Sequence, residues 1–109
     1  FSLLGGEPFE PENQPTLAEL LVKIKTELPD KDIWCYTGFL FEDILSGKVG
    51  NGDTAKTMLN NIDVLVDGRF ERDSRDITLK FRGSKNQRII DVPKSIEVSE
   101  VVLWEGIDD

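Results

Sequence analysis

The order of apolar and polar positions predicts strands and helices that alternate along the chain. Three short apolar runs end at or beside a glycine, as buried strands do, and the stretches between them carry apolar residues at helical spacing. The predicted strands cover residues 1–4, 33–37 and 62–67, and the predicted helices cover residues 17–28, 39–45 and 54–60. This order is typical of a parallel sheet with helical crossovers, so the sequence predicts an α/β fold.

The first predicted helix carries signals for its start, its buried face and its end. Thr16, followed three residues later by Glu19, has the pattern of a capping box, and Pro29 follows the last apolar position. One face collects apolar residues three, four and seven apart: Leu17, Leu20, Leu21, Ile24 and Leu28. We therefore expect a helix that follows the N-cap Thr16 and buries this face.

The chain changes character after Gly68. Basic residues cluster there among acidic and polar ones: Arg69, Arg72, Arg75, Arg82, Lys85 and Arg88. We interpret this stretch as a long polar connection, with a last strand or an edge segment over residues 98–104. The pattern leaves the packing of the tail, residues 91–109, open. A chain of 109 residues suffices for a single core, so we expect one domain over residues 1–109.

Composition excludes several classes of function. Hydrophobic residues make up 39% and charged residues 31%, which is ordinary for a folded protein. A net charge of -8 argues against nucleic-acid binding, and no apolar run approaches the roughly 20 residues of a membrane span. Without histidine and with one cysteine, Cys35, the chain offers neither a histidine-based hydrolase nor an internal disulfide or metal centre. We expect a cytoplasmic protein that binds neither nucleic acid nor membrane.

Polar residues follow the predicted strands at the edge where α/β enzymes place their ligands. Thr37 and Gly38 end the second strand, and Asp67 ends the third. Glu7 follows a glycine pair after the first strand, and its carboxylate could accept from an ammonium group. These residues could share one pocket. The structural alternative is that Thr37 and Asp67 cap the turns that follow them.

Four blocks of residues in this order carry a family resemblance. They are Leu-Gly-Gly-Glu-Pro at 4–8, Ile-Trp-Cys-Tyr-Thr-Gly at 33–38, Val-Leu-Val-Asp-Gly-Arg-Phe at 64–70 and Arg-Gly-Ser-Lys-Asn-Gln at 82–87. Over about residues 3–87 the chain resembles the activating proteins of anaerobic ribonucleoside-triphosphate reductases, which are radical S-adenosylmethionine (SAM) oxidoreductases.

The resemblance implies a partial parallel (β/α) barrel, truncated here at its N-terminal side, and the generation of a glycyl radical on the reductase with electrons from a donor such as flavodoxin. It implies SAM and a [4Fe-4S] cluster held by three cysteines, spaced C-x3-C-x2-C, that precede the Gly-Gly-Glu motif. This sequence begins after that loop, so the cluster ligands are expected outside the chain, Cys35 is not among them, and the chain alone is expected to be inactive.

The residues that the resemblance assigns to SAM come from all four blocks. They are Gly5, Gly6, Glu7, Thr37, Gly38, Asp67 and Asn86. Asn86 and Gln87 are expected either to stabilise the loop near SAM or to face the reductase. No acid-base catalytic residue and no metal ligand is expected in the chain.

Two other functions stay open from the sequence. One is activation of another glycyl radical enzyme, such as one of the pyruvate formate-lyase type. The other is a non-catalytic α/β binding module. A phosphate-binding loop at Gly5 and Gly6 is disfavoured, because the lysine and the glycine spacing of such loops are missing.

Overall fold

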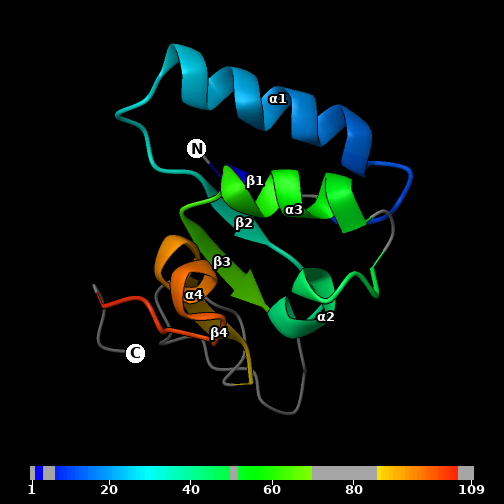
Figure 1. The fold of residues 1–109 in the computed structure, drawn as a ribbon, viewed down its shortest axis with the longest axis vertical. Coiled ribbons are helices and arrows are strands. Elements are labelled where there is room, and N and C mark those ends of the chain that lie inside the picture. The colour runs from blue at the N-terminus through cyan, green and yellow to red at the C-terminus, as the bar shows by residue number, and fades with distance from the viewer. Residues whose placement is uncertain (1, 4–6, 50–51, 70–85, 106–109) are drawn as a thin grey trace.

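A computed structural model of the chain describes residues 2–3, 7–49, 52–69 and 86–105. In chain order the elements are β1 (Ser2–Leu3), α1 (Gln14–Glu27), β2 (Trp34–Tyr36), α2 (Phe41–Leu45), α3 (Gly52–Asn60), β3 (Val64–Asp67), β4 (Arg88–Asp91) and α4 (Val92–Val98). The strands form one sheet in the order β1-β2-β3-β4 (Figure 1). Both pairs among β1, β2 and β3 are parallel, whereas β4 runs antiparallel to β3. The predicted α/β class is confirmed, but the prediction of an all-parallel sheet is wrong at β4.

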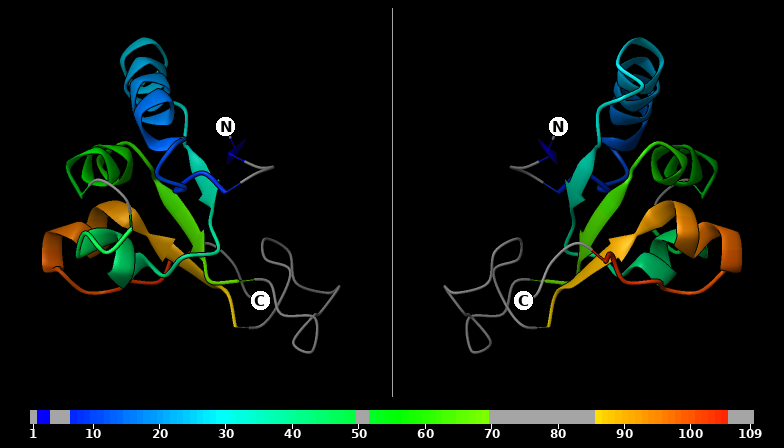
Figure 2. Two further views of the ribbon diagram at one scale, coloured as in Figure 1. Left: turned by 90° about the vertical axis from the view of Figure 1, so that its right-hand side faces the viewer. Right: turned by 90° about the vertical axis from the view of Figure 1, so that its left-hand side faces the viewer.

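The helices lie on one side of the sheet, as the two side views of Figure 2 show. The strands turn Cys35, Leu65 and Ile90 toward the helices, and all three side chains are fully buried. The helices add buried side chains from four elements: Leu21, Phe41, Ile44, Ala55, Met58, Leu59 and Val92. This single apolar layer between helices and sheet is the main core.

The opposite face of the sheet carries the alternate residues of the strands, because successive side chains of a strand point to opposite sides. Val64, Val66 and Ile89 are buried there, and partly buried aromatic side chains pack against them. Trp34 and Trp104 meet edge to face, with ring centroids 4.9 Å apart and planes at 78°. The C-terminal segment is thereby attached to the face that the described helices leave uncovered.

Helix α1 starts earlier than the sequence predicts. It begins at Gln14, so Thr16 lies inside the first turn and the predicted capping box is wrong. The residue before the helix, Asn13, makes no capping bond with its side chain, which instead donates to the carbonyl of Glu7 at 3.2 Å. Pro15 is tolerated in the first turn because the backbone N–H groups there have no partner within the helix.

The buried face of α1 is also rotated from the predicted one. Leu20 and Leu28 are 43% and 42% exposed, whereas Gln14, Ala18 and Leu21 are buried. The apolar residues of this helix spread over more than one face, so their pattern does not determine which face is buried. Ala18 and Gln14 gave no strong apolar signal for the face that is buried. The buried Gln14 amide donates to the carbonyl of Phe9 at 2.8 Å, which compensates its burial on the donor side.

Strand β4 and helix α4 lie where the sequence predicted the end of a polar connection and a tail of open packing. The strand has only two buried apolar residues, Ile89 and Ile90, between Arg88 and Asp91, so its apolar signal is short. Asp91 accepts from the N–H of Lys94 at 3.1 Å and caps α4, a start signal that the sequence does contain.

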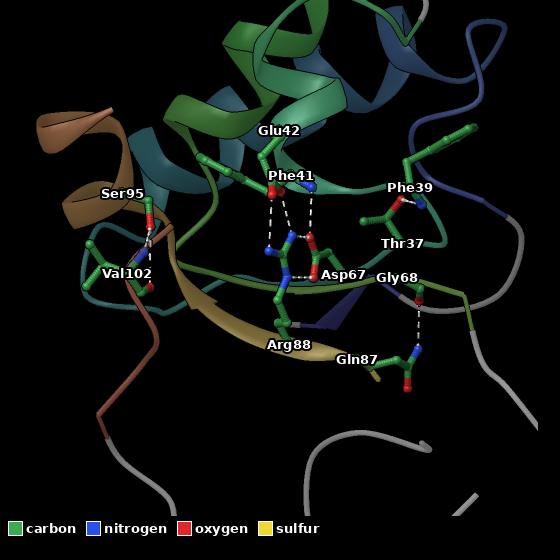
Figure 3. A network of polar contacts seen from close by, with 10 residues as sticks. All are labelled: Thr37, Phe39, Phe41, Glu42, Asp67, Gly68, Gln87, Arg88, Ser95 and Val102. Carbon is green, nitrogen blue, oxygen red and sulfur yellow. Dashed lines mark hydrogen bonds and ion pairs between the residues drawn. The ribbon is translucent and has the colours of Figure 1, made fainter. Parts of the chain in front are cut away.

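Of the two alternatives predicted over residues 98–104, the segment after α4 forms the edge segment beside β4 and not a strand. It makes one isolated bridge, between Ile90 and Leu103, and Val101 packs against the main core. The hydroxyl of Ser95 accepts from the N–H of Val102 at 2.8 Å (Figure 3). Of the helices in the described part of the chain, none has the length and apolar character needed to cross a membrane.

Candidate functional site

Three of the side chains assigned to the site lie together at the carboxyl ends of the parallel strands. Thr37 directly follows β2, Asp67 is the last residue of β3, and Glu7 reaches Thr37 from the segment that follows β1. Gly5 and Gly6 fall outside the described residues. Glu7 and Thr37 therefore meet at this edge, whereas Asp67 ends β3 at the same edge and has its own contacts, to α2 and β4.

Glu7 joins the segment after β1 to the turn after β2. Its Oε2 accepts from the N–H of Phe9 at 2.9 Å and from the hydroxyl of Thr37 at 2.7 Å, and its Oε1 accepts from the N–H of Gly38 at 2.6 Å. A carboxylate has about four acceptor positions. The half-buried Glu7 can therefore hold this turn and still accept from about one further donor, such as an ammonium group.

Gly38 is a glycine because Glu7 comes so close. A Cβ at this position would lie 3.3 Å from Glu7 Oε1 and 3.5 Å from Cγ of Arg69. The first of these distances is shorter than an ordinary van der Waals contact, so a side chain would push the carboxylate away from the Gly38 N–H. The absence of a side chain at Gly38 thus leaves room for the contact between its N–H and Glu7.

Asp67 is completely buried and points toward the helices. Alternation along β3 places it on the same face as Leu65. Its Oδ2 accepts from the N–H of Phe41, the first residue of α2, at 2.8 Å, and from Nη2 of Arg88, while its Oδ1 accepts from Nε of Arg88 at 3.0 Å (Figure 3). Asp67 caps the start of α2, so the geometry favours the structural alternative for this residue over direct contact with a ligand.

Arg88 connects two carboxylates, and the sequence did not single it out. Beyond Asp67 it reaches Glu42, with Nη2 at 2.5 Å from Oε1 and Nη1 at 3.2 Å from Oε2. The hydrogen bond from Arg88 lowers the pKa of Glu42, and the bonds to Asp67 and Glu42 raise the pKa of Arg88. The signal that could have found it is strand register, because an antiparallel strand after β3 places its first residue beside the last residue of β3.

Asn86 and Gln87 tie the start of β4 to the turn after β3. The amide of Asn86 donates to the carbonyl of Arg69 at 2.7 Å, and that of Gln87 donates to the carbonyl of Gly68 at 3.0 Å. Gly68 has a φ of +92°, in the left-handed region that glycine adopts without strain. These bonds support the loop-stabilising role of the two amides.

The described residues do not form a site for an iron-sulfur cluster. A [4Fe-4S] cluster is held by cysteine thiolates, and the single cysteine of the sequence, Cys35, is fully buried. Burial, and to a smaller extent the charge of Glu7, raises the pKa of this thiol, so it stays protonated. Within residues 2–3, 7–49, 52–69 and 86–105, no three His, Cys, Asp or Glu side chains are grouped to hold a metal ion.

Two surface hollows lie among the helices and share no residue with this site. One, of about 340 Å³, is lined by residues of α2, α3, α4 and Ser99. The other, of about 350 Å³, lies between α1 and Thr57 of α3. The edge at the strand ends is therefore distinguished by its polar contacts and not by either of these hollows.

Comparison with known proteins gives consistent matches. The model of a family described as "4Fe-4S single cluster domain" matches residues 1–90. Proteins named anaerobic ribonucleoside-triphosphate reductase-activating protein match with 42% identity in Vibrio cholerae, 40% in Haemophilus influenzae and 38% in Escherichia coli. These matches cover 81%, 81% and 79% of this chain and 52%, 52% and 51% of the relatives. The chain thus spans about half the length of the relatives that it matches, and the resemblance found in the sequence is confirmed. No solved structure matches it.

Proposed function

Because the chain belongs to the 4Fe-4S single cluster domain family, we propose that it is part of a radical SAM activase that generates a glycyl radical on an anaerobic ribonucleoside-triphosphate reductase. The observation that carries this proposal is the identity of about 40% to activating proteins of that reductase over about four fifths of this chain. The activity, the partners and a cytoplasmic location of the complete protein are all part of the proposal.

The fold supports the proposal through its layer arrangement. Parallel strands β1, β2 and β3 with helices on one face are what a partial (β/α) barrel presents, and we propose that the sheet belongs to such a barrel, with further strands beyond β1. In that arrangement the carboxyl ends of the strands carry the ligand. Glu7, Thr37 and Gly38 would then face SAM.

The residues of this chain would bind and orient SAM, which supplies the radical chemistry when the cluster is present. The acceptor position left on Glu7 fits the ammonium group of the methionine moiety. Thr37 and Gly38 hold Glu7 in place with their hydroxyl and N–H, and Asp67 contributes from beneath by fixing the start of α2. No side chain of the set needs to transfer a proton, because the cofactors carry the chemistry.

The test uses the full-length protein that carries this chain, with its cluster reconstituted without oxygen. With SAM, a reduced electron donor such as flavodoxin and the anaerobic reductase, electron paramagnetic resonance should detect a glycyl radical on the reductase. The same mixture with a pyruvate formate-lyase type enzyme is the comparison. A signal only with the second enzyme would move the protein to that branch, and no signal with either would reject the activase.

The 109-residue chain by itself serves as the negative control. We expect it to form no 5'-deoxyadenosine from SAM under reducing, anaerobic conditions, because Cys35 is its only cysteine and is buried. Product formation by the isolated chain would contradict the assignment of the cluster ligands to residues outside it.

A further inference from the structure

We infer that Arg88 is the positioning residue of the candidate SAM site, acting through Asp67, Glu42 and the first turn of α2. The inference rests on the proposed function for what the site binds, and on the geometry of this chain for how Arg88 controls it. Neither Arg88 nor Glu42 belongs to the motifs that the sequence assigned to SAM.

Arg88 makes contacts that few other side chains could replace. Its Nε and Nη2 donate to the two oxygens of Asp67, and its Nη1 and Nη2 donate to the two oxygens of Glu42. Only a planar guanidinium presents donors along two edges, so that each edge meets one carboxylate in bidentate fashion. A lysine ammonium could neutralise one carboxylate but could not align both.

The burial of Asp67 makes this contact necessary. Asp67 is 0% exposed, and a buried carboxylate needs a cation and hydrogen-bond donors to offset its lost hydration. In the part of the chain that the structure describes, Arg88 supplies the cation and Phe41 supplies the backbone N–H. Without Arg88, the buried carboxylate would lose the cation that offsets its lost hydration, and its bond to Phe41 would weaken.

The two carboxylates transmit the position of Arg88 to the turn that holds Glu7. Asp67 binds the first residue of α2, and Glu42 is the second, so Arg88 fixes the start of this helix from both sides. The turn just before the helix is tied to Thr37, whose hydroxyl accepts from the N–H of Phe39 at 3.2 Å. Movement of α2 therefore moves the donors that orient Glu7.

The antiparallel direction of β4 brings Arg88 to this place. Asp67 and Arg88 are direct partners across β3 and β4, with both side chains on the helix-covered face. The amides of Asn86 and Gln87 attach the residues before Arg88 to the turn after β3. The backbone that carries the guanidinium is thus held on one side by the pairing of β4 with β3 and on the other by the side-chain bonds of Asn86 and Gln87.

A matched control exists at the amino end of β3. Lys25 contacts Oδ2 of Asp63 at 2.5 Å, and this oxygen also accepts from the N–H of Ile33 at 2.7 Å. The arrangement has the same parts, a carboxylate, a cation and a backbone N–H, but it lies at the amino end of β3. Neutralising Lys25 should affect stability without reaching the Glu7 turn.

The first readout needs no cofactor. In 1H–15N spectra of this chain, Arg88→Gln should shift the amide signals of Gly38 and Phe41, whereas Lys25→Gln should leave both in place. Arg88→Lys keeps the charge and is the second variant in case the first does not fold. It should still shift both amides, because one ammonium cannot hold both carboxylates. Unmoved amides in folded Arg88 variants would overturn the inference.

The second readout uses the full-length, cluster-loaded protein. Arg88→Gln should raise the KM for SAM about tenfold relative to Lys25→Gln, with a smaller change in kcat, because a displaced binding turn weakens binding first. Arg88→Lys should lie between Arg88→Gln and the wild type. Equal KM values for the Arg88 and Lys25 variants would show that Arg88 forms a structural ion pair and does not position the site. If the wild-type protein forms no glycyl radical with SAM, the proposed function fails, while the amide shifts still decide whether Arg88 positions the turn.

Discussion

At each end of β3 an aspartate is paired with a cation, but the two ion pairs differ in what else they contact. Asp63 precedes the strand and Asp67 ends it, and each binds a cation and the N–H of a residue in a neighbouring segment. Asp63 and Lys25 keep about a quarter of their side chains exposed, whereas Asp67 is wholly buried. The pair of Asp67 and Arg88 also contacts α2, and through it the turn that holds Glu7. We infer from the comparison that the pair at Asp67 influences the candidate site because the backbone N–H that it binds belongs to α2.

The largest difference between the two ends should come from removing each carboxylate charge. Asp67→Asn should lower the free energy of unfolding by about 3 kcal/mol, because it removes the charge of a fully buried carboxylate and leaves Arg88 with one charged partner. Asp63→Asn should cost only about 1 kcal/mol, because water compensates a partly exposed pair. Urea unfolding of the two variants measures both values. Equal losses would remove the distinction between the ends.

A smaller effect is expected from filling the space at Gly38. Gly38→Ala places a Cβ 3.3 Å from Glu7 Oε1 and should cost about 1–2 kcal/mol, since the carboxylate must move from its donors. Gly52→Ala is the control, because its Cβ would be 3.7 Å from the nearest atom and alanine favours the helix that begins there. Thermal unfolding should show a lower midpoint for the first variant and an equal or higher one for the second. The reverse order would mean that Glu7 adapts at no cost.

The smallest effect is expected at the exposed ion pair between Arg88 and Glu42. Arg88 lowers the pKa of Glu42 in the folded protein, so this group adds stability above its ordinary pKa of 4.5 and loses it as the pH falls toward the lowered value. Glu42→Gln should cost less than about 1 kcal/mol at pH 7, because the side chain is 57% exposed. The difference from wild type should shrink below pH 4.5 in urea titrations at several pH values. A difference that stays constant across this range would assign the effect to packing.

Much of the parallel half of the fold could be predicted from local signals. The strands that became β2 and β3 and the helices between them lie within a few residues of their predicted bounds, because apolar runs and glycines mark them. The meeting of Thr37 and Asp67 at one edge followed from parallel strand order alone. For those elements, local pattern and final structure agree.

What could not be predicted depends on contacts between distant residues. Asp67 and Arg88 are 21 positions apart, and only the register of β3 with β4 makes them partners. With two apolar residues, Ile89 and Ile90, β4 is too short to give a periodic signal. Whether Asp67 faces a ligand or a helix end likewise depends on which side of the sheet the helices cover.

The edge-to-face contact of Trp34 and Trp104 allows the docking of the C-terminal segment to be followed by tryptophan fluorescence. The chain has two tryptophans, and this one contact joins both of them, one from β2 and one from the segment after α4. Their emission therefore reports on a single tertiary contact on the face opposite the described helices. Any event that lifts this segment from the sheet changes the surroundings of both fluorophores at once, while the helical core on the other side contributes no tryptophan signal.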